Sequence, residues 1–284
     1  MVKSIKNIKR QANENAGKFY WPAVATLVCY IMIPSLFNSL SILFGSDLTQ
    51  TFFQNLQAGS VEMGPLLSAL WGLMSVPRSA ILVVIGQGIS FVFQLYYVGI
   101  CGQMIQLYQG EQPSTKMAFA AFPNQFSKKL LVVFKQRMLI FAWGLLVLVS
   151  IVLINVLTMW IPVTSDLFPG IAALFIFLSF VPSFIKAYAY SLTPYLLAEF
   201  PDIKSWDVIK TSILMTNGYK GKICVMQVRY GLTQLLGRLT FGLSQTFRTE
   251  PRMQAQLAGL YCELRDNAIK KRIVSRKTLE GTGE

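Results

Sequence analysis

Long apolar runs alternate with short charged segments along this chain. Four runs contain no Asp, Glu, Lys or Arg, and they cover residues 19–46, 79–110, 138–165 and 167–185. A helix needs about 20 mostly apolar residues to cross the hydrocarbon core of a membrane, and each run approaches or exceeds that length. The pattern therefore predicts membrane helices near residues 19–44, 79–108, 138–160 and 168–198.

A fifth apolar segment, residues 223–247, is interrupted by Arg229 and Arg238. A charged side chain inside a membrane is costly unless it meets a partner or water. The segment could form a hairpin with the residues that follow it, lie in the membrane interface, or be completed by another subunit. The predicted fold is accordingly an all-α integral membrane helical bundle. It has four firm membrane helices, each built on one of the uncharged runs, and two doubtful ones in a hairpin over residues 223–265.

Basic residues gather in the segments beside the apolar runs. The start of the chain, residues 1–18, carries five Lys or Arg and one Glu, and residues 109–137 are also basic. Cytoplasmic segments carry an excess of Lys and Arg, so both termini are predicted to be cytoplasmic. The chain then divides into a basic tail (1–18), a membrane domain (19–265) and a second basic tail (266–284). The net charge of +13 fits anionic lipid headgroups as partners, because no nucleic-acid-binding motif accompanies it.

Residues 199–218 predict a turn followed by a short amphipathic helix. Pro201 cannot continue a helix, and Ser205 suits the N-cap position of the next one. Asn217-Gly218 is a typical helix stop. One face at helical spacing comprises Trp206, Ile209, Ile213 and Thr216. The element is either a connector that lies flat on the membrane surface or a cytoplasmic docking or gating element.

Two motifs flank this connector, Leu197-Ala198-Glu199-Phe200-Pro201 and Met215-Thr216-Asn217-Gly218-Tyr219-Lys220. Further short motifs follow along the chain: Leu235-Leu236-Gly237, Leu239-Thr240, Gly242, Pro251, Leu257-Ala258 and Tyr261-Cys262-Glu263-Leu264. In these motifs the chain resembles the bacterial polytopic membrane-protein family known as domain of unknown function 975. The resemblance implies a helical membrane protein and brings no activity with it. Arg252 is a departure, because relatives favour a Tyr at this place.

Few residues of the chain suit catalysis or metal binding. Histidine, the commonest general base and metal ligand, is absent. The four cysteines are scattered and form no CxxC pair, which favours buried free thiols over a disulfide framework or a metal site. The sequence contains no GxSxG, P-loop or HExxH motif. We therefore predict that the chain is not an enzyme and that it has no catalytic residues, cofactor or metal.

Three basic residues are the candidate contacts for a lipid or a solute, namely Lys186, Arg229 and Arg238. Lys186 lies about 27 Å along the fourth predicted helix, near the inner headgroups. Nearby in the sequence are Tyr188, Tyr190 and Tyr195. This favours a lysine that snorkels to the interface within an aromatic belt, and an ion or lipid-phosphate contact is the alternative.

These observations predict an integral, multi-pass protein of the cell membrane with an unassigned role. One hypothesis is a non-enzymatic accessory, scaffold or lipid-interacting protein, with anionic headgroups and a membrane-protein partner or a homo-oligomer as its partners. The alternative is a transporter or channel for a small polar or anionic solute, with Arg229 and Arg238 as substrate ligands. The second predicted helix carries Gly86, Gly88, Gly99 and Gly102. These glycines could line a pore, although close helix–helix contact is the simpler interpretation.

Overall fold

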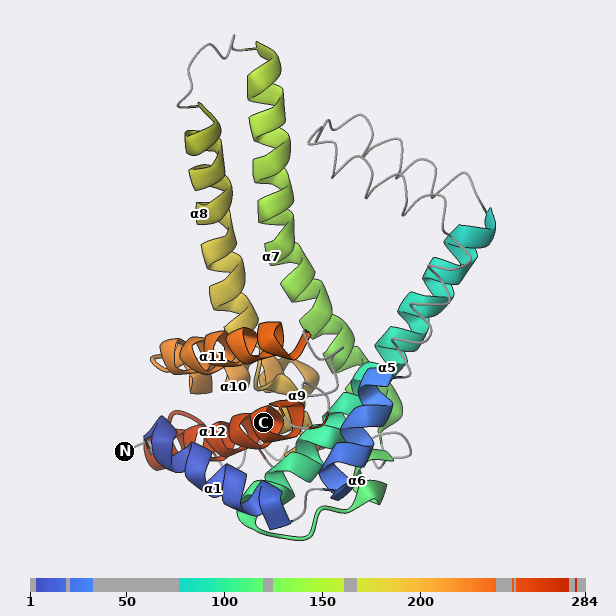
Figure 1. Ribbon diagram of the computed structural model, residues 1–284, viewed down its shortest axis with the longest axis vertical. Coiled ribbons are helices and arrows are strands. Elements are labelled where there is room, and N and C mark those ends of the chain that lie inside the picture. Colours follow the sequence, from blue (N-terminus) through green and yellow to red (C-terminus); the bar gives the residue numbers. More distant parts are fainter. Residues whose placement is uncertain are drawn as a thin grey trace. The chain divides into compact units, whose positions relative to one another are not determined.

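All regular structure in the described part of the chain is helical, as the apolar runs predict (Figure 1). This computed structural model describes residues 4–18, 21–32, 77–119, 125–160, 168–238, 247, 249–275 and 279. The chain forms two compact units, one made of Cys29–Gln94 and the other of Met1–Val28 with Leu95–Glu284. The second unit holds most of the described residues and all of the sites considered below.

Three described stretches are long and apolar enough to cross a membrane, Gly88–Gln109, Phe126–Ile154 and Leu174–Glu199. They lie in helices α5 (Pro77–Gln109), α7 (Phe126–Trp160) and α8 (Phe168–Ala189), the last continuing into α9 (Thr193–Glu199). Their positions match three of the predicted membrane helices, which identifies the chain as an all-α membrane protein. The helix predicted at 19–44 is described only over Trp21–Met32, and the rest of it lies outside the described residues.

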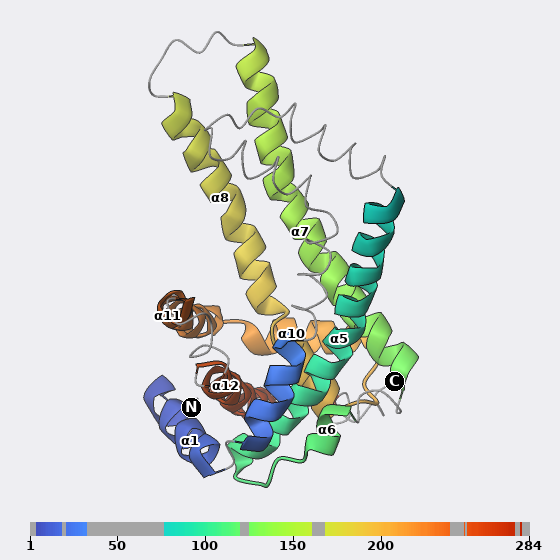
Figure 2. The ribbon, with the colours of Figure 1, turned by 45° about the vertical axis from the view of Figure 1, so that its right-hand side comes forward.

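The helices α7 and α8 run side by side in opposite directions in both views (Figures 1 and 2). Ser183 Oγ on α8 donates a hydrogen bond of 2.7 Å to the Trp143 carbonyl on α7. Elsewhere the pair presents apolar side chains outward. More than half exposed are Phe141, Leu148 and Val149 on α7 and Leu174, Phe177, Leu178 and Phe184 on α8. Lipid tails are a natural cover for such a surface.

The predicted fourth membrane helix, 168–198, is broken into α8 and α9 by a turn at residues 190–192. The break has a local cause, because the ring of Pro194 would clash with the carbonyl of Tyr190 in a continuous helix. The carbonyls at the end of α8 are satisfied by neighbouring helices. The Ala189 carbonyl accepts a 2.8 Å bond from Ser212 Oγ, and the Tyr190 carbonyl accepts a 3.0 Å bond from Gln136 Nε2.

The third membrane helix begins earlier than predicted, at Phe126 instead of residue 138. The basic segment before residue 138 also contains the short helix α6 (Thr115–Phe119). The prediction started the helix after the last charged residue of this segment. Charge, however, only keeps a segment out of the hydrocarbon core and does not prevent it from being helical. Lys and Arg are good helix formers, so the helix continues into the charged segment.

The short helix after the turn, α10 (Ser205–Thr216), is confirmed, and Gly218 takes the positive φ of 78° expected of a helix stop. One detail of the prediction is wrong, because Lys204 and not Ser205 occupies the N-cap position, with no side-chain cap. On the predicted apolar face, Ile209 is buried and Trp206 is 51% exposed. The buried face comprises Val208, Ile209, Thr211, Ser212, Met215 and Thr216. Hydroxyl groups can lie inside because they bond to carbonyls, as Ser212 does to Ala189.

Within residues 223–265, the structure describes parts of α11 (Lys220–Arg238) and α12 (Glu250–Lys270), and neither helix is among the three described stretches suited to crossing a membrane. Instead, α12 packs along α1 (Ile5–Lys18), which contains most of the basic start of the chain. Contacts also join α11 to α8 and α10 to α12. We call α1, α9, α10, α11 and α12 the basal layer. In both views α10 and α11 lie near the lower ends of α7 and α8, and α12 and α1 lie beneath them (Figures 1 and 2).

Glycines mark the closest approaches between helices. A Cβ at Gly259 of α12 would lie 2.4 Å from the Tyr108 ring and 2.9 Å from Ile8 Cγ2. A Cβ at Gly99 of α5 would lie 2.1 Å from the Ala118 carbonyl oxygen. The packing role predicted for Gly99 is therefore confirmed, whereas Gly88 has no described atom within 4 Å of such a Cβ.

Candidate functional site

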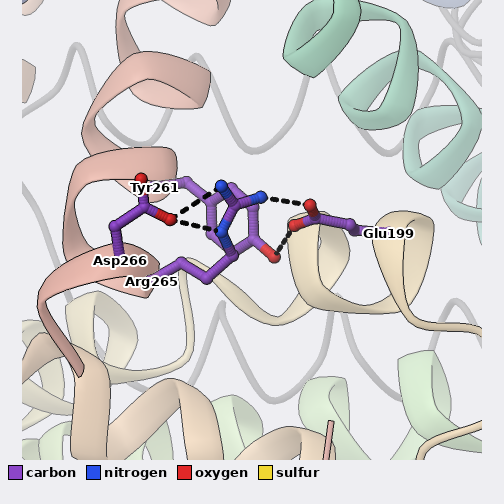
Figure 3. Close-up of polar contacts among 4 residues, drawn as sticks. All are labelled: Glu199, Tyr261, Arg265 and Asp266. Atoms are coloured by element: carbon purple, nitrogen blue, oxygen red, sulfur yellow. Dashed lines mark hydrogen bonds and ion pairs between the residues drawn. The ribbon is translucent and has the colours of Figure 1, made fainter. Parts of the chain in front are cut away.

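A hydrogen-bonded ion-pair cluster joins α9 to α12 inside the basal layer (Figure 3). The Glu199 carboxylate, at the end of α9, accepts a 2.5 Å hydrogen bond from Tyr261 Oη and pairs with the Arg265 guanidinium. Arg265 also donates two bonds, of 2.9 and 2.8 Å, to Asp266 Oδ1. The side chains of Arg265 and Glu199 are only 15% and 23% exposed, so this pair is largely removed from water.

The electrostatics of the cluster hold its groups in fixed protonation states. Burial raises the pKa of Tyr261 well above its ordinary value, and the Glu199 carboxylate raises it further. Burial lowers the pKa of Arg265, but the hydrogen bonds to Asp266 and the charge of Glu199 raise it more, so its net shift is upward. Burial also raises the pKa of the adjacent Cys262 thiol to about 12. At neutral pH the cluster thus offers a neutral tyrosine, a cation and an unreactive thiol.

The polar contacts continue from this cluster towards α5. Tyr261 stacks on Tyr195 of α9, with ring centroids 5.5 Å apart and an interplanar angle of 22°. Tyr195 Oη donates a 3.1 Å bond to Gln254 Oε1, which also accepts a 3.1 Å bond from Tyr97 Oη on α5. The chain of contacts ties α12 to two other helices, and its buried groups are engaged with one another. Its arrangement is that of a structural network.

A separate cavity of about 280 Å³ lies between α1, α11 and α12. Its described lining residues are Lys9, Asn13, Arg229, Tyr230, Thr249, Arg252 and Gln256. Three of them are basic, and none of the described ones is acidic. Gln256 Nε2 donates a 3.1 Å bond to Asn13 Oδ1. Burial raises the pKa of Tyr230 to about 12, although the charges of Arg229 and Arg252 oppose the shift, so this phenol stays protonated at neutral pH.

Lysines also pair with aromatic rings where the spanning helices meet the basal layer. Lys186 Nζ lies 4.8 Å from the centre of the Trp143 ring, and Lys135 Nζ lies 5.1 Å from that of Trp206. On α11, Lys222 Nζ lies 5.4 Å from the ring centre of Tyr219. All three distances are within the range of cation–π contact. All three lysines are half-buried.

The three candidate residues that were chosen from the sequence lie in different parts of the structure. Arg229 lines the cavity, whereas Lys186 lies over Trp143 on the α7–α8 pair. Arg238 is the last residue of α11, and its side chain is outside the described part of the structure.

Sequence reasoning missed the partners of Arg229 in the cavity, which are Lys9 and Arg252. A signal for Arg252 existed, because the residue departs from the pattern of the family that the chain resembles. The Glu199–Tyr261 contact was also missed, although both residues belong to family-like motifs. No comparable signal pointed to Arg265.

Comparisons with known proteins extend this description over most of the chain. A model of the family described as "Protein of unknown function (DUF975)" matches residues 1–268. The match includes every residue of the ion-pair cluster and of the basic cavity. No curated protein and no solved structure matches the chain.

Proposed function

The chain belongs to the DUF975 family of proteins of unknown function, and from this premise we propose its role. We propose that it is a multi-pass protein of the cell membrane that works without catalysis. Its basal layer would lie at the inner membrane face and bind anionic lipid headgroups. In this role the protein serves as an accessory or scaffold protein for a membrane-protein partner or for further copies of itself.

The observation that carries this proposal is the set of lysine–aromatic pairs beside the spanning helices. Lys135, Lys186 and Lys222 each lie over an aromatic ring and remain half-buried. Amphipathic side chains of both kinds are favoured at the membrane interface, where a lysine stem contacts apolar surface while its ammonium group stays in the polar region. Each cation near the surface of an anionic leaflet contributes about 1 kcal/mol of attraction.

The protonation states and hydrogen bonds of the buried polar groups support a role without catalysis. A nucleophile or general base needs a pKa near the working pH. Cys262 is instead held as a thiol by a pKa of about 12, and Tyr261 as a phenol by a pKa well above its ordinary value. The Glu199 carboxylate is occupied by Tyr261 and Arg265. These groups stabilise contacts between helices and are poorly suited to attack a substrate.

Native mass spectrometry tests the lipid-binding role. The protein is placed in nanodiscs of neutral lipid with and without anionic lipid, and the lipids retained after release are counted. We expect preferential retention of anionic lipid and its loss in a triple variant, Lys135→Gln, Lys186→Gln and Lys222→Gln.

The matched control changes three exposed lysines, Lys116→Gln, Lys210→Gln and Lys270→Gln, so that the net charge changes equally. Retention that ignores headgroup charge, or that falls equally in both variants, would refute the proposal. A protein released as a bare homo-oligomer with a small polar ligand would favour the alternative, a transporter or channel for a small polar or anionic solute. A heteromeric complex would instead identify the partner of an accessory protein.

A further inference from the structure

The cavity between α1, α11 and α12 brings together cations that are far apart in the sequence. Lys9, Arg229 and Arg252 line it, each from a different helix. We propose that this cavity is a binding site for a phosphate group, carried either by a lipid headgroup or by a small soluble anion. The inference deepens the proposed function, on which it rests for the lipid as a source of phosphate.

The packing of α1 against α12 brings two of these cations, Lys9 and Arg252, together. On α1, Ile8 precedes Lys9 and is 1% exposed, and it lies against the Cα of Gly259 on α12 so closely that a Cβ there would be 2.9 Å away. The close approach of the two helices fixes the separation of their polar residues as well. Asn13 and Gln256 are hydrogen-bonded across the same interface, one helical turn from Lys9 and Arg252, respectively. Lys9 and Arg252 therefore line one cavity because α1 packs against α12, and Arg229 of α11 adds a third cation to the lining.

Like charges that share a cavity repel one another, and the described lining residues supply no carboxylate to offset them. An anion in the cavity would relieve this repulsion. Two guanidinium groups favour phosphate in particular, because their planar arrays of N–H donors match its oxygens. The side-chain amides of Asn13 and Gln256, which are hydrogen-bonded to each other, add uncharged N–H groups to the same wall.

The size of the cavity limits the ligand. Its volume of about 280 Å³ lies just below the range of roughly 300–1,000 Å³ that is usual for pockets of drug-sized ligands. A phosphate with a small substituent, such as glycerol phosphate or a compact lipid headgroup, suits this volume. A lipid would need only its headgroup inside, with its tails outside the cavity.

Binding can be measured on the full-length protein in a non-ionic detergent. Inorganic phosphate and glycerol phosphate are titrated by calorimetry, and the thermal unfolding temperature is followed at constant ionic strength with chloride as the reference anion. A ligand that binds the folded state raises this temperature. We expect Arg229→Gln and Arg252→Gln each to weaken phosphate binding roughly tenfold or more, because each removes charge-assisted hydrogen bonds.

Two variants control for charge and for geometry. Arg137, like Arg229 and Arg252, is an exposed arginine, but it lies on α7 and not in the cavity lining, so Arg137→Gln should leave phosphate affinity unchanged. Arg252→Lys keeps the charge but loses the bidentate donor pair, so it should bind with intermediate affinity. Circular dichroism and size-exclusion chromatography check that each variant is folded. Equal effects of Arg137→Gln and Arg252→Gln would overturn the proposal.

A second arm of the experiment separates the sources of phosphate. Nanodiscs that contain phosphatidic acid replace free phosphate, and native mass spectrometry counts the retained lipid. Binding of the lipid alone assigns a headgroup, and binding of free phosphate alone assigns a soluble anion. If neither binds, or if neither depends on Arg229 and Arg252, the site does not exist. The triple lysine variant should keep the cavity ligand, so a failure of the lipid-binding role is distinguishable from a failure of this inference.

Discussion

The α7–α8 pair and the α1–α12 pair bury different kinds of side chain, although both are helix–helix contacts within one unit of the chain. In the most apolar windows of the first pair, only 6% and 11% of residues are buried. In α12, thirteen of 21 residues are buried, including Gln254, Gln256 and Asn267. In the spanning pair, hydrophobicity therefore marks residues left for lipid to cover. In the basal layer, burial depends on small residues and satisfied polar groups.

The difference follows from the solvent that each region meets. Apolar side chains gain little from leaving lipid, so helix pairs in a membrane need not hide them. The basal layer instead gains stability by burying surface, and most of the polar groups that it buries must then be hydrogen-bonded. Among the described residues, Thr193 Oγ1 of α9 is an exception, because it is buried without a hydrogen-bond partner. Three substitutions test this comparison, in order of decreasing expected effect.

The largest effect is expected for Arg265→Met. The change leaves the Glu199 carboxylate without its cation in a site where the two side chains are only 15% and 23% exposed. Loss of one partner of a buried ion pair costs about 3–5 kcal/mol, and partial exposure places this case near about 3 kcal/mol. The free energy of unfolding in detergent, measured by chemical denaturation, would report the loss.

The matched control for this prediction is Arg10→Met. Arg10 pairs with Glu14 at 3.7 Å, but the two side chains are 80% and 64% exposed, so its removal should cost at most about 0.5 kcal/mol. The double variant Glu199→Met with Arg265→Met should recover part of the stability, because no buried charge is then left alone. Equal effects of Arg265→Met and Arg10→Met would show that the polar cluster contributes nothing special to the basal layer.

A smaller effect is expected for Gly259→Ala, which tests the close packing of the basal layer. The added Cβ would lie 2.4 Å from the Tyr108 ring and 2.9 Å from Ile8, so α1 or Tyr108 must move. Overpacking of this kind costs about 1–3 kcal/mol. The same measurement of unfolding applies, and limited proteolysis within α1 would detect its release from α12.

Gly231→Ala, in the interior of α11, provides the control, because no described atom lies within 4 Å of a Cβ at that position. Alanine is favoured over glycine in a helix, so this variant should be stabilised by about 0.5–1 kcal/mol. If Gly259→Ala were also stabilising, the contact between α1 and α12 would be looser than the structure has it, and the convergence of cations at the cavity would lose its cause.

The spanning helices could be predicted from the sequence because the requirement for about 20 apolar residues acts on each segment alone. Their ends were harder to predict, since two local effects decided them. Lys128 and Lys135 continue α7 beyond the hydrocarbon, and Pro194 divides the fourth helix. Neither effect changes the hydrophobic pattern. Pro194 could have been given more weight, because its clash with Tyr190 is a local property of the chain.

The candidate site was only partly predictable, because its residues come from three distant segments. Arg229 was selected from the sequence as a charge in an apolar run, but its cavity is completed by Lys9 and Arg252. That convergence depends on the packing of α1 against α12, in which Gly259 allows the close approach of Ile8. The buried face of α10 was similarly hard to predict from the sequence, because the hydroxyl of the buried Ser212 is satisfied by the carbonyl of Ala189 on another helix.

The smallest effect is expected for Phe177→Ala on the spanning pair. Phe177 is 66% exposed on α8, and lipid should cover it in the membrane. Because lipid tails can fill the space left by the ring, the free energy of unfolding in bicelles should change by less than about 0.5 kcal/mol. Leu196→Ala is the contrast, since Leu196 is 0% exposed in α9 and its truncation should cost about 2–5 kcal/mol. If Phe177→Ala cost as much as Leu196→Ala, the outer face of α8 would be packed against protein, and the apolar surface of the pair would be an interface with another subunit.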